Sequence, residues 1–188
     1  MSIVEVGIKL DKPLEYYIKM LEEQGLKKVY EVTTHDIYYT DKDLNGFTER
    51  EMKNACIRLR SCNDSNYVIQ NDLSDLNIKE VSKEELSFFE EKLSKLDYKK
   101  VFDTVKKDYH YIKDGMNSKI QLQEIDDIGL VVYYDNKAYY GYDENIQRQK
   151  LIEELNTYGF NVNNDSLDID KLRTLYYGKE TYSLNQNL

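Results

Sequence analysis

Residues 4–10 read Val4-Glu5-Val6-Gly7-Ile8-Lys9-Leu10, in which charged or small residues alternate with apolar ones. This two-residue period is that of a β-strand, whose successive side chains point to opposite faces. Residues 55–60, Ala55-Cys56-Ile57-Arg58-Leu59-Arg60, repeat the alternation. Glu5 and Lys9 therefore share one face of a predicted strand, and Arg58 and Arg60 share one face of another.

Two interpretations of this polar surface stay open. If the strands curve so that the charged side faces inward, they line a cationic cavity with a carboxylate at its edge, which suits a polyphosphate and its metal ion. If the charged side faces outward, it is only the solvated face of a sheet.

The composition is typical of a soluble, folded protein. The chain has 188 residues, of which 40% are hydrophobic and 32% charged, with a single proline. A net charge of −9 without a block of like charges argues against nucleic acid as a partner. The two cysteines have no His or Cys cluster beside them and predict reduced packing residues. Neither a leader nor an apolar run long enough for a bilayer is evident, so we expect a cytoplasmic protein without membrane contact.

The chain repeats part of itself at an offset of 72 residues. Lys27-Lys28-Val29-Tyr30-Glu31 is echoed by Lys99-Lys100-Val101-Phe102-Asp103, and Asp36 matches Asp108. An amphipathic helix with Pro13 in its first turn is predicted to end at Gly25, and its counterpart begins with a capping-box pattern at Ser82 and Glu85. Each half is thus predicted to contain strand, helix and strand, within one pseudo-duplicated domain.

Later elements follow from the same patterns. Residues 119–122 and 130–134 are predicted strands, joined by a turn through Asp126, Asp127 and Gly129. A helix is expected from an Asp143 cap to Gly159, and another over residues 169–177. Strands with helices between them predict a curved, mostly antiparallel α+β fold.

At this point the chain resembles the CYTH domains, or triphosphate tunnel metalloenzymes, which include class IV adenylate cyclases and thiamine triphosphatases. The resemblance spans nearly the whole chain and rests on the order and spacing of several short motifs. These are Glu5-x-Gly7-x-Lys9, His35-Asp36-Ile37-Tyr38-Tyr39, Ile57-Arg58-Leu59-Arg60, Lys107 at the start of a strand, Gln123-Glu124-Ile125-Asp126-Asp127-Ile128-Gly129, and Glu180-Thr181-Tyr182.

The resemblance implies an eight-stranded antiparallel tunnel, closed or nearly closed, with flanking helices. It would form a single domain over residues 1–188, with half repeats of about 1–72 and 73–144 and a helical C-terminal segment over 143–188. Carried over by position, the phosphate-holding cations would be Lys9, Arg58, Arg60 and Lys107. Glu5 and Asp135 would hold one magnesium or manganese ion.

Several acids expected from the resemblance are missing. Gly7 replaces the second acid of the N-terminal motif, Gln123 replaces an aspartate, and Tyr133-x-Asp135 stands for a Glu-x-Glu pair. Asn71 stands where a lysine is usual, and Tyr109 where an arginine is usual. Because Mg²⁺ is held by carboxylates, these changes weaken metal-assisted chemistry more than they weaken anion binding.

Three functions remain open from the sequence. The first is a metal-dependent phosphohydrolase or cyclase acting on a triphosphate such as ATP, thiamine triphosphate or inorganic triphosphate. The second is a catalytically silent module that binds a nucleotide, polyphosphate or other anion. The third is a structural or partner-binding α+β protein whose charged strand faces simply meet water.

Overall fold

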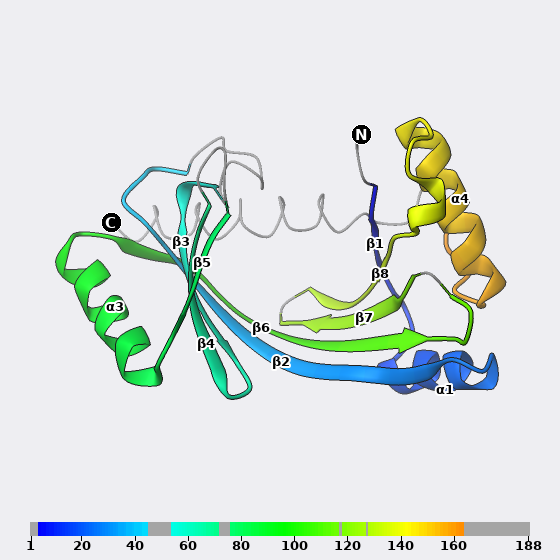
Figure 1. Ribbon diagram of the computed structural model, residues 1–188, viewed down its shortest axis with the longest axis horizontal. Helices are drawn as coiled ribbons and strands as arrows, with labels where there is room; N and C mark the ends of the chain where they lie inside the picture. The colour runs from blue at the N-terminus through cyan, green and yellow to red at the C-terminus, as the bar shows by residue number, and fades with distance from the viewer. Residues whose placement is uncertain (1–3, 45–53, 72–75, 117, 127, 164–188) are drawn as a thin grey trace. The chain divides into compact units, whose positions relative to one another are not determined.

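Eight strands form one antiparallel sheet in the computed structural model, which describes residues 4–44, 54–71, 76–116, 118–126 and 128–163. Their order is β1-β8-β7-β6-β2-β3-β4-β5 (Figure 1). The strands are β1 (Val6–Lys9), β2 (Lys27–Thr40), β3 (Ile57–Cys62), β4 (Ser65–Asn71), β5 (Leu76–Val81), β6 (Lys99–Ile112), β7 (Ile120–Ile125) and β8 (Gly129–Tyr134). The predicted α+β class and the eight antiparallel strands are confirmed.

The sheet is not closed by hydrogen bonds. β1, which pairs with β8, and β5, which pairs with β4, are the two edge strands of the sheet. Among the described residues, no pairing joins β1 to β5. Closure of an antiparallel sheet requires its two edge strands to pair with each other. The expectation of a closed or nearly closed tunnel is therefore borne out only as an eight-stranded antiparallel sheet, which is not closed.

Three α-helices accompany the sheet in the part of the chain that is described. They are α1 (Leu14–Glu23), α3 (Lys83–Lys95) and α4 (Glu144–Thr157), and a short 3-10 helix, η1 (Lys137–Tyr139), precedes α4. The predicted capping box is present, since the Ser82 side chain accepts from the Glu85 N–H and the Glu85 carboxylate accepts from the Ser82 N–H. Asp143 caps α4 as predicted. None of the described helices has the length and apolarity needed to span a bilayer.

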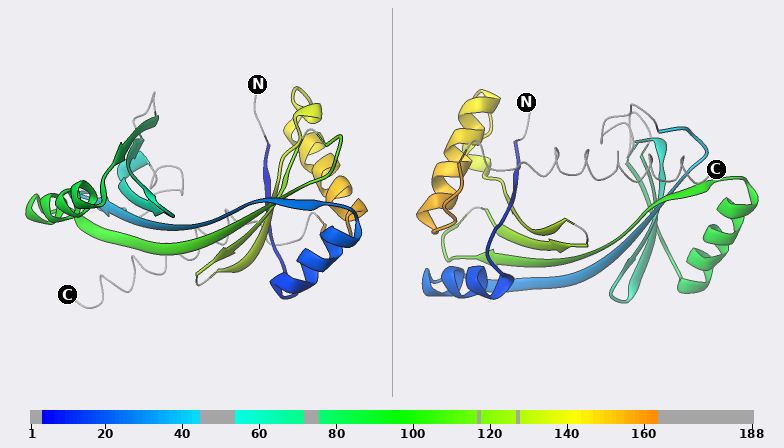
Figure 2. Two further views of the ribbon diagram at one scale, coloured as in Figure 1. Left: turned by 60° about the horizontal axis from the view of Figure 1, so that its bottom comes forward. Right: turned by 180° about the vertical axis from the view of Figure 1, so that it is seen from behind.

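The same succession of strand, helix and three strands occurs twice along the chain. β1-α1-β2-β3-β4 is followed by β5-α3-β6-β7-β8. β2 and β6 each have 14 residues and begin at Lys27 and Lys99, 72 residues apart. The first strand of each half pairs with the last strand of the other, and the two long strands run side by side (Figures 1 and 2).

The chain divides into two compact units. Unit 1 comprises Met1–Val32 and Lys107–Leu172, and unit 2 comprises Thr33–Lys106 and Arg173–Leu188. β2 and β6 each contribute to both units. The helix predicted over residues 169–177, the motif at 180–182 and Asp127 lie outside the described residues, as does the side chain of Asn71.

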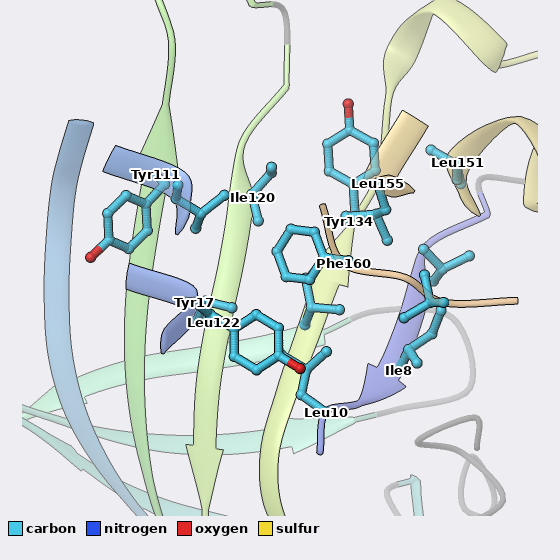
Figure 3. Packing of buried hydrophobic residues seen from close by; sticks show 14 of the residues in the cluster. Ile8, Leu10, Tyr17, Tyr111, Ile120, Leu122, Tyr134, Leu151, Leu155 and Phe160 are labelled. Carbon is cyan, nitrogen blue, oxygen red and sulfur yellow. The ribbon is translucent and has the colours of Figure 1, made fainter. Parts of the chain in front are cut away.

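The core of unit 1 is built on one face of its strands. α1 and α4 cover this face, where alternate residues of the strands, such as Ile8, Leu122 and Tyr134, are fully buried (Figure 3). The rings of Tyr17 and Phe160 stack 5.6 Å apart in the same cluster. The opposite face of β1, which carries Glu5, Gly7 and Lys9, is therefore the one that these helices do not cover.

In unit 2, α3 covers one face of the sheet. Leu93 packs there against Tyr39 and Leu59, with Leu86 and Phe89 beside them. Because side chains alternate along a strand, the neighbours of these residues in sequence point to the opposite face. Arg58, Arg60 and Asp36 therefore lie on the face away from α3. Both cysteines are free thiols, and Cys56 is buried beside Tyr38 and Phe102, as its predicted packing role requires.

Candidate functional site

Buried charge gathers on the face of unit 2 that α3 leaves uncovered. β2 and β3 pair in a register that sets Asp36 opposite Arg60 and Tyr38 opposite Arg58. Paired residues of neighbouring strands project to the same side of a sheet, so the alternation of β3 alone is enough to bring both arginines beside Asp36. Lys106, on β6, joins them from the other side of β2.

Asp36 is the centre of this cationic cluster, which consists of Asp36, Arg58, Arg60 and Lys106. Its side chain is fully buried, and Arg60 binds it through two bonds, Nε–Oδ1 at 2.6 Å and Nη2–Oδ2 at 2.7 Å. Lys106 Nζ lies 3.2 Å from Oδ2, and Arg58 Nη1 lies 3.9 Å from it. Three cations thus surround one carboxylate, and the four residues together carry an excess of positive charge.

Arg58 is held mainly by Tyr38. Its Nη1 donates to the Tyr38 hydroxyl at 3.2 Å, and the guanidinium carbon lies 5.7 Å from the centre of the Tyr38 ring. Arg58 Nε is buried and has no hydrogen-bond partner. Because a guanidinium offers five N–H donors, Arg58 keeps capacity to bind a further acceptor. The Arg58 and Arg60 side chains are 20% and 29% exposed, so an anion from solution can reach them.

The charges of the cluster favour the ionised form of Asp36. Burial acts to raise the pKa of Asp36, but the Arg60 hydrogen bond and the charges of Lys106, Arg60 and Arg58 outweigh it and lower that pKa below 3.8. The hydrogen bond to Asp36 in turn raises the pKa of Arg60. A buried carboxylate held in this way orients the cations around it.

Glu5 and Asp135, the predicted metal pair, lie close together in unit 1. Val6 pairs with Tyr134 in an antiparallel register, so Glu5, which precedes Val6, adjoins Asp135, which follows Tyr134. The Tyr140 hydroxyl donates to Asp135 Oδ2 at 2.7 Å. This bond, and then the charges of Asp135 and Glu5, raise the pKa of Tyr140. Asp135 therefore contacts Tyr140 directly, and the charge of Glu5 acts on the same hydroxyl.

A divalent metal ion needs more ligands than these two carboxylates supply. Mg²⁺ needs six oxygens and is commonly bound by one or two carboxylates together with substrate phosphates and water. Over the described ranges, no group of three or more His, Cys, Asp or Glu side chains could hold an ion. As ligands of a divalent ion, Glu5 and Asp135 would supply part of the six oxygens, and phosphate or water the rest.

The remaining predicted cations lie elsewhere. Lys9 is exposed and lines a pocket of about 550 Å³ with Asp11, Lys12 and the residues around Phe160. Lys107 lies on the face of β6 opposite to Lys106, where its Nζ is 3.2 Å from Glu31 and 5.1 Å from the centre of the Tyr109 ring. The β6 lysine that lies at Asp36 together with Arg58 and Arg60 is therefore Lys106.

Sequence reasoning assigned no role to Asp36, Tyr38 or Lys106. The signal for the first two was present, because both belong to the quoted motif 35–39 and alternate on one face of a strand. No such signal marks Lys106, since Lys106 and Lys107 are adjacent and only the register of β6 decides which one faces Asp36.

Comparison with known proteins identifies the fold. No family model matches the chain, and no curated protein matches it. Among solved structures, a protein from Pyrococcus horikoshii superposes with a TM-score of 0.54 at 14% identity, covering 84% of this chain and 91% of the other. A candidate adenylate cyclase from Vibrio parahaemolyticus superposes with a TM-score of 0.51 at 14% identity, covering 82% and 87%.

A third structure, a candidate adenylyl cyclase from Hippeastrum described as having a dominant triphosphatase activity, superposes with a TM-score of 0.52 at 10% identity. The match covers 85% of this chain and 89% of that one. At such identities the likeness concerns the fold alone. The chain has the fold of these proteins, and the resemblance to CYTH domains is confirmed at that level.

Proposed function

We propose that this protein binds the phosphate groups of a triphosphate-containing small molecule through Arg58, Arg60 and Lys106. The observation that carries the proposal is the excess of positive charge around the fully buried Asp36. Guanidinium groups bind phosphate oxygens through paired N–H donors, and Arg58 has donor capacity left. The shared fold with a protein described as a triphosphatase supports the triphosphate as ligand.

The cations predicted for the ligand are revised accordingly. Lys106 takes the place of Lys107, because Lys107 faces Glu31 on the other side of β6. Lys9 lies in unit 1, where its exposed side chain is open to an anion, and its role in phosphate binding stays a prediction. In this proposal Asp36 does not touch the ligand but keeps the three cations oriented.

Calorimetry with inorganic tripolyphosphate in EDTA tests the proposal. We expect saturable binding without metal and a loss of about tenfold or more in Arg58→Gln, because one hydrogen bond to a charged group contributes about 1.5–3 kcal/mol. The matched control is Lys79→Gln, which removes the same charge from the opposite face of unit 2, where Lys79 lies 5.8 Å from the Phe89 ring. Equal losses in the two variants, or no binding at all, would refute the site.

Catalysis is a second candidate function, favoured by the bond from Tyr140 to Asp135 and by the charge of Glu5 that acts on the same hydroxyl. A divalent ion held there would neutralise charge on a transferring phosphoryl group. Release of phosphate or of a cyclic nucleotide from ATP, thiamine triphosphate or tripolyphosphate should then require Mg²⁺ or Mn²⁺. This release should vanish in the double variant Glu5→Gln/Asp135→Asn. If the protein binds these three compounds but releases no product from any of them, the catalytically silent binding module is its function.

A further inference from the structure

A second buried carboxylate, Asp108 of β6, lies in unit 1 without a cation to balance it. Its residue is 8% exposed. Within the described ranges no lysine, arginine or histidine forms an ion pair with it. Its partners are two neutral amides, since Gln121 Nε2 donates to Oδ1 at 2.6 Å and Gln123 Nε2 donates to the same oxygen. Burying a charge that is balanced only by neutral dipoles is costly.

Two titratable residues, Lys106 and His110, flank Asp108 on this face of β6, and neither forms an ion pair with it. Lys106, two residues before Asp108, binds Asp36 instead. His110 lies two residues further along β6, and burial, followed by the charge of Lys119, lowers its pKa below 6.5 despite the opposing effect of Asp108. His110 is therefore neutral at pH 7. Among the described residues Asp108 thus has amide donors but no ion-pair partner, in contrast to Asp36.

A second observation indicates a missing hydrogen-bond donor. Gln123 is 7% exposed, and its Oε1 is buried without any partner. An orphaned buried carbonyl costs about 1–3 kcal/mol, so such groups are rarely left unsatisfied without a reason. Both amide groups of Gln121 and Gln123 converge on Asp108 Oδ1, and no hydrogen bond from the described chain reaches Oδ2. A carboxylate oxygen and an amide oxygen are thus both available as acceptors.

Apolar side chains adjoin these acceptors. Gln121 pairs with Tyr133 and Gln123 pairs with Val131 across β7 and β8, so all four project to one face. Val131 and Tyr133 belong to a buried apolar cluster with Ile125 and Ile128. A ligand that fits both features combines a positively charged N–H donor with an apolar group.

We infer that Asp108 and Gln123 form a binding site for an organic ammonium ion, whose N–H groups donate to the Asp108 carboxylate and to Gln123 Oε1. The carbon substituent of the ammonium lies against the apolar cluster of Val131 and Tyr133. No residue of this site belongs to the cationic cluster around Asp36, so the two sites are tested separately.

Benzylammonium, which is protonated at neutral pH, is the probe for this site. Calorimetry should show saturable binding, at least about tenfold tighter than for benzyltrimethylammonium, which keeps the charge and the ring but has no N–H donor. Benzyl alcohol, which keeps a donor but lacks the charge, should bind as weakly. Equal binding of the two cations would reduce the site to general electrostatics and overturn the inference.

Two isosteric variants separate this site from the net charge of the protein. Asp108→Asn should weaken benzylammonium binding by about tenfold or more, whereas Asp103→Asn should leave it unchanged. Asp103 lies on the same strand but is bound to Lys100 and His35. Equal losses in both variants would contradict the inference.

A measurement on the unmodified protein guards against a variant that fails to fold. The side-chain amide protons of Gln121 and Gln123 should shift in NMR spectra on addition of benzylammonium and not of benzyltrimethylammonium. Amide signals that stay unmoved at saturating probe would overturn the assignment, whatever the variants do.

Discussion

Asp36 and Asp108 occupy the same position in the two halves of the chain and are held by opposite kinds of partner. Each is the tenth residue of a 14-residue strand, β2 or β6. Asp36 faces Arg58 and Arg60, the second and fourth residues of β3, whereas Asp108 faces Gln121 and Gln123, the second and fourth residues of β7. One backbone arrangement thus carries a cationic cluster in one half and a negative, amide-lined site in the other.

The difference teaches that the duplicated strands supply only the position of a buried carboxylate. The second and fourth residues of the following strand, β3 or β7, decide which ligand the site attracts. Arginines overcompensate the carboxylate and favour an anion, while glutamines leave its charge in place and favour a cation.

The largest expected effect is on stability, and it should differ between the two aspartates. Asp36→Asn places an amide among three cations and should lower the free energy of unfolding by about 3 kcal/mol, because removing one partner strands buried charges. Asp108→Asn removes a buried charge that only neutral amides balance and keeps an oxygen to accept from Gln121 and Gln123, so it should change the free energy of unfolding by less than about 1 kcal/mol. Urea unfolding of both variants measures the difference, and equal losses would break the comparison.

Exchanging the partners between the halves should weaken the binding of each half's own ligand. Arg58→Gln/Arg60→Gln should weaken tripolyphosphate binding by about a hundredfold, at about 1.5–3 kcal/mol per charged hydrogen bond. The surroundings of Asp108 indicate that a carboxylate between two glutamines is compatible with this backbone.

The reciprocal variant Gln121→Arg/Gln123→Arg should abolish benzylammonium binding, because two guanidinium groups would occupy the Asp108 carboxylate. Calorimetry with both probes on both double variants completes the test. A double variant that keeps its original ligand preference would show that the partner residues do not set it.

Asp36 should contribute to the pH dependence of stability. The folded pKa of Asp36 lies below its ordinary 3.8, so its contribution is fully present above about pH 4 and is lost as the pH falls through the folded value. Unfolding free energies measured from pH 5 to pH 2 should therefore fall less steeply in Asp36→Asn than in the unmodified protein. Parallel curves would mean that the cations do not stabilise the ionised form.

The alternation of residues 57–60 is a local property, and it was enough to predict that Arg58 and Arg60 share a face. The amphipathic helices and the Ser82 capping box were likewise readable from the sequence, because capping and burial depend on residues three or four positions apart. The eight antiparallel strands followed from the resemblance between motifs spread along the chain.

What could not be predicted depends on pairing between distant strands. Lys106 and Lys107 differ only in the face they occupy, and the register of β6 in the sheet decides which one meets Asp36. From the sequence, Gln123 was noted only as the replacement of an expected aspartate. Its contact with Asp108 could not be predicted, because that contact requires β6 and β7 to be neighbours. Closure of the sheet depends on its two edge strands, which no local pattern describes.

The smallest effect tests whether the comparison extends to the helices. α3 begins with the capping box of Ser82 and Glu85, whereas α1, its counterpart, begins at Pro13 without a side-chain cap. Ser82→Ala should lower the free energy of unfolding by about 1 kcal/mol, the usual cost of a lost cap. Pro13→Ala should cost less, since no side-chain bond is removed, and urea unfolding at pH 7 compares the two. If Pro13→Ala cost as much as Ser82→Ala, the ends of the two helices would be energetically alike, and the difference between the halves would be confined to the residues around the two aspartates.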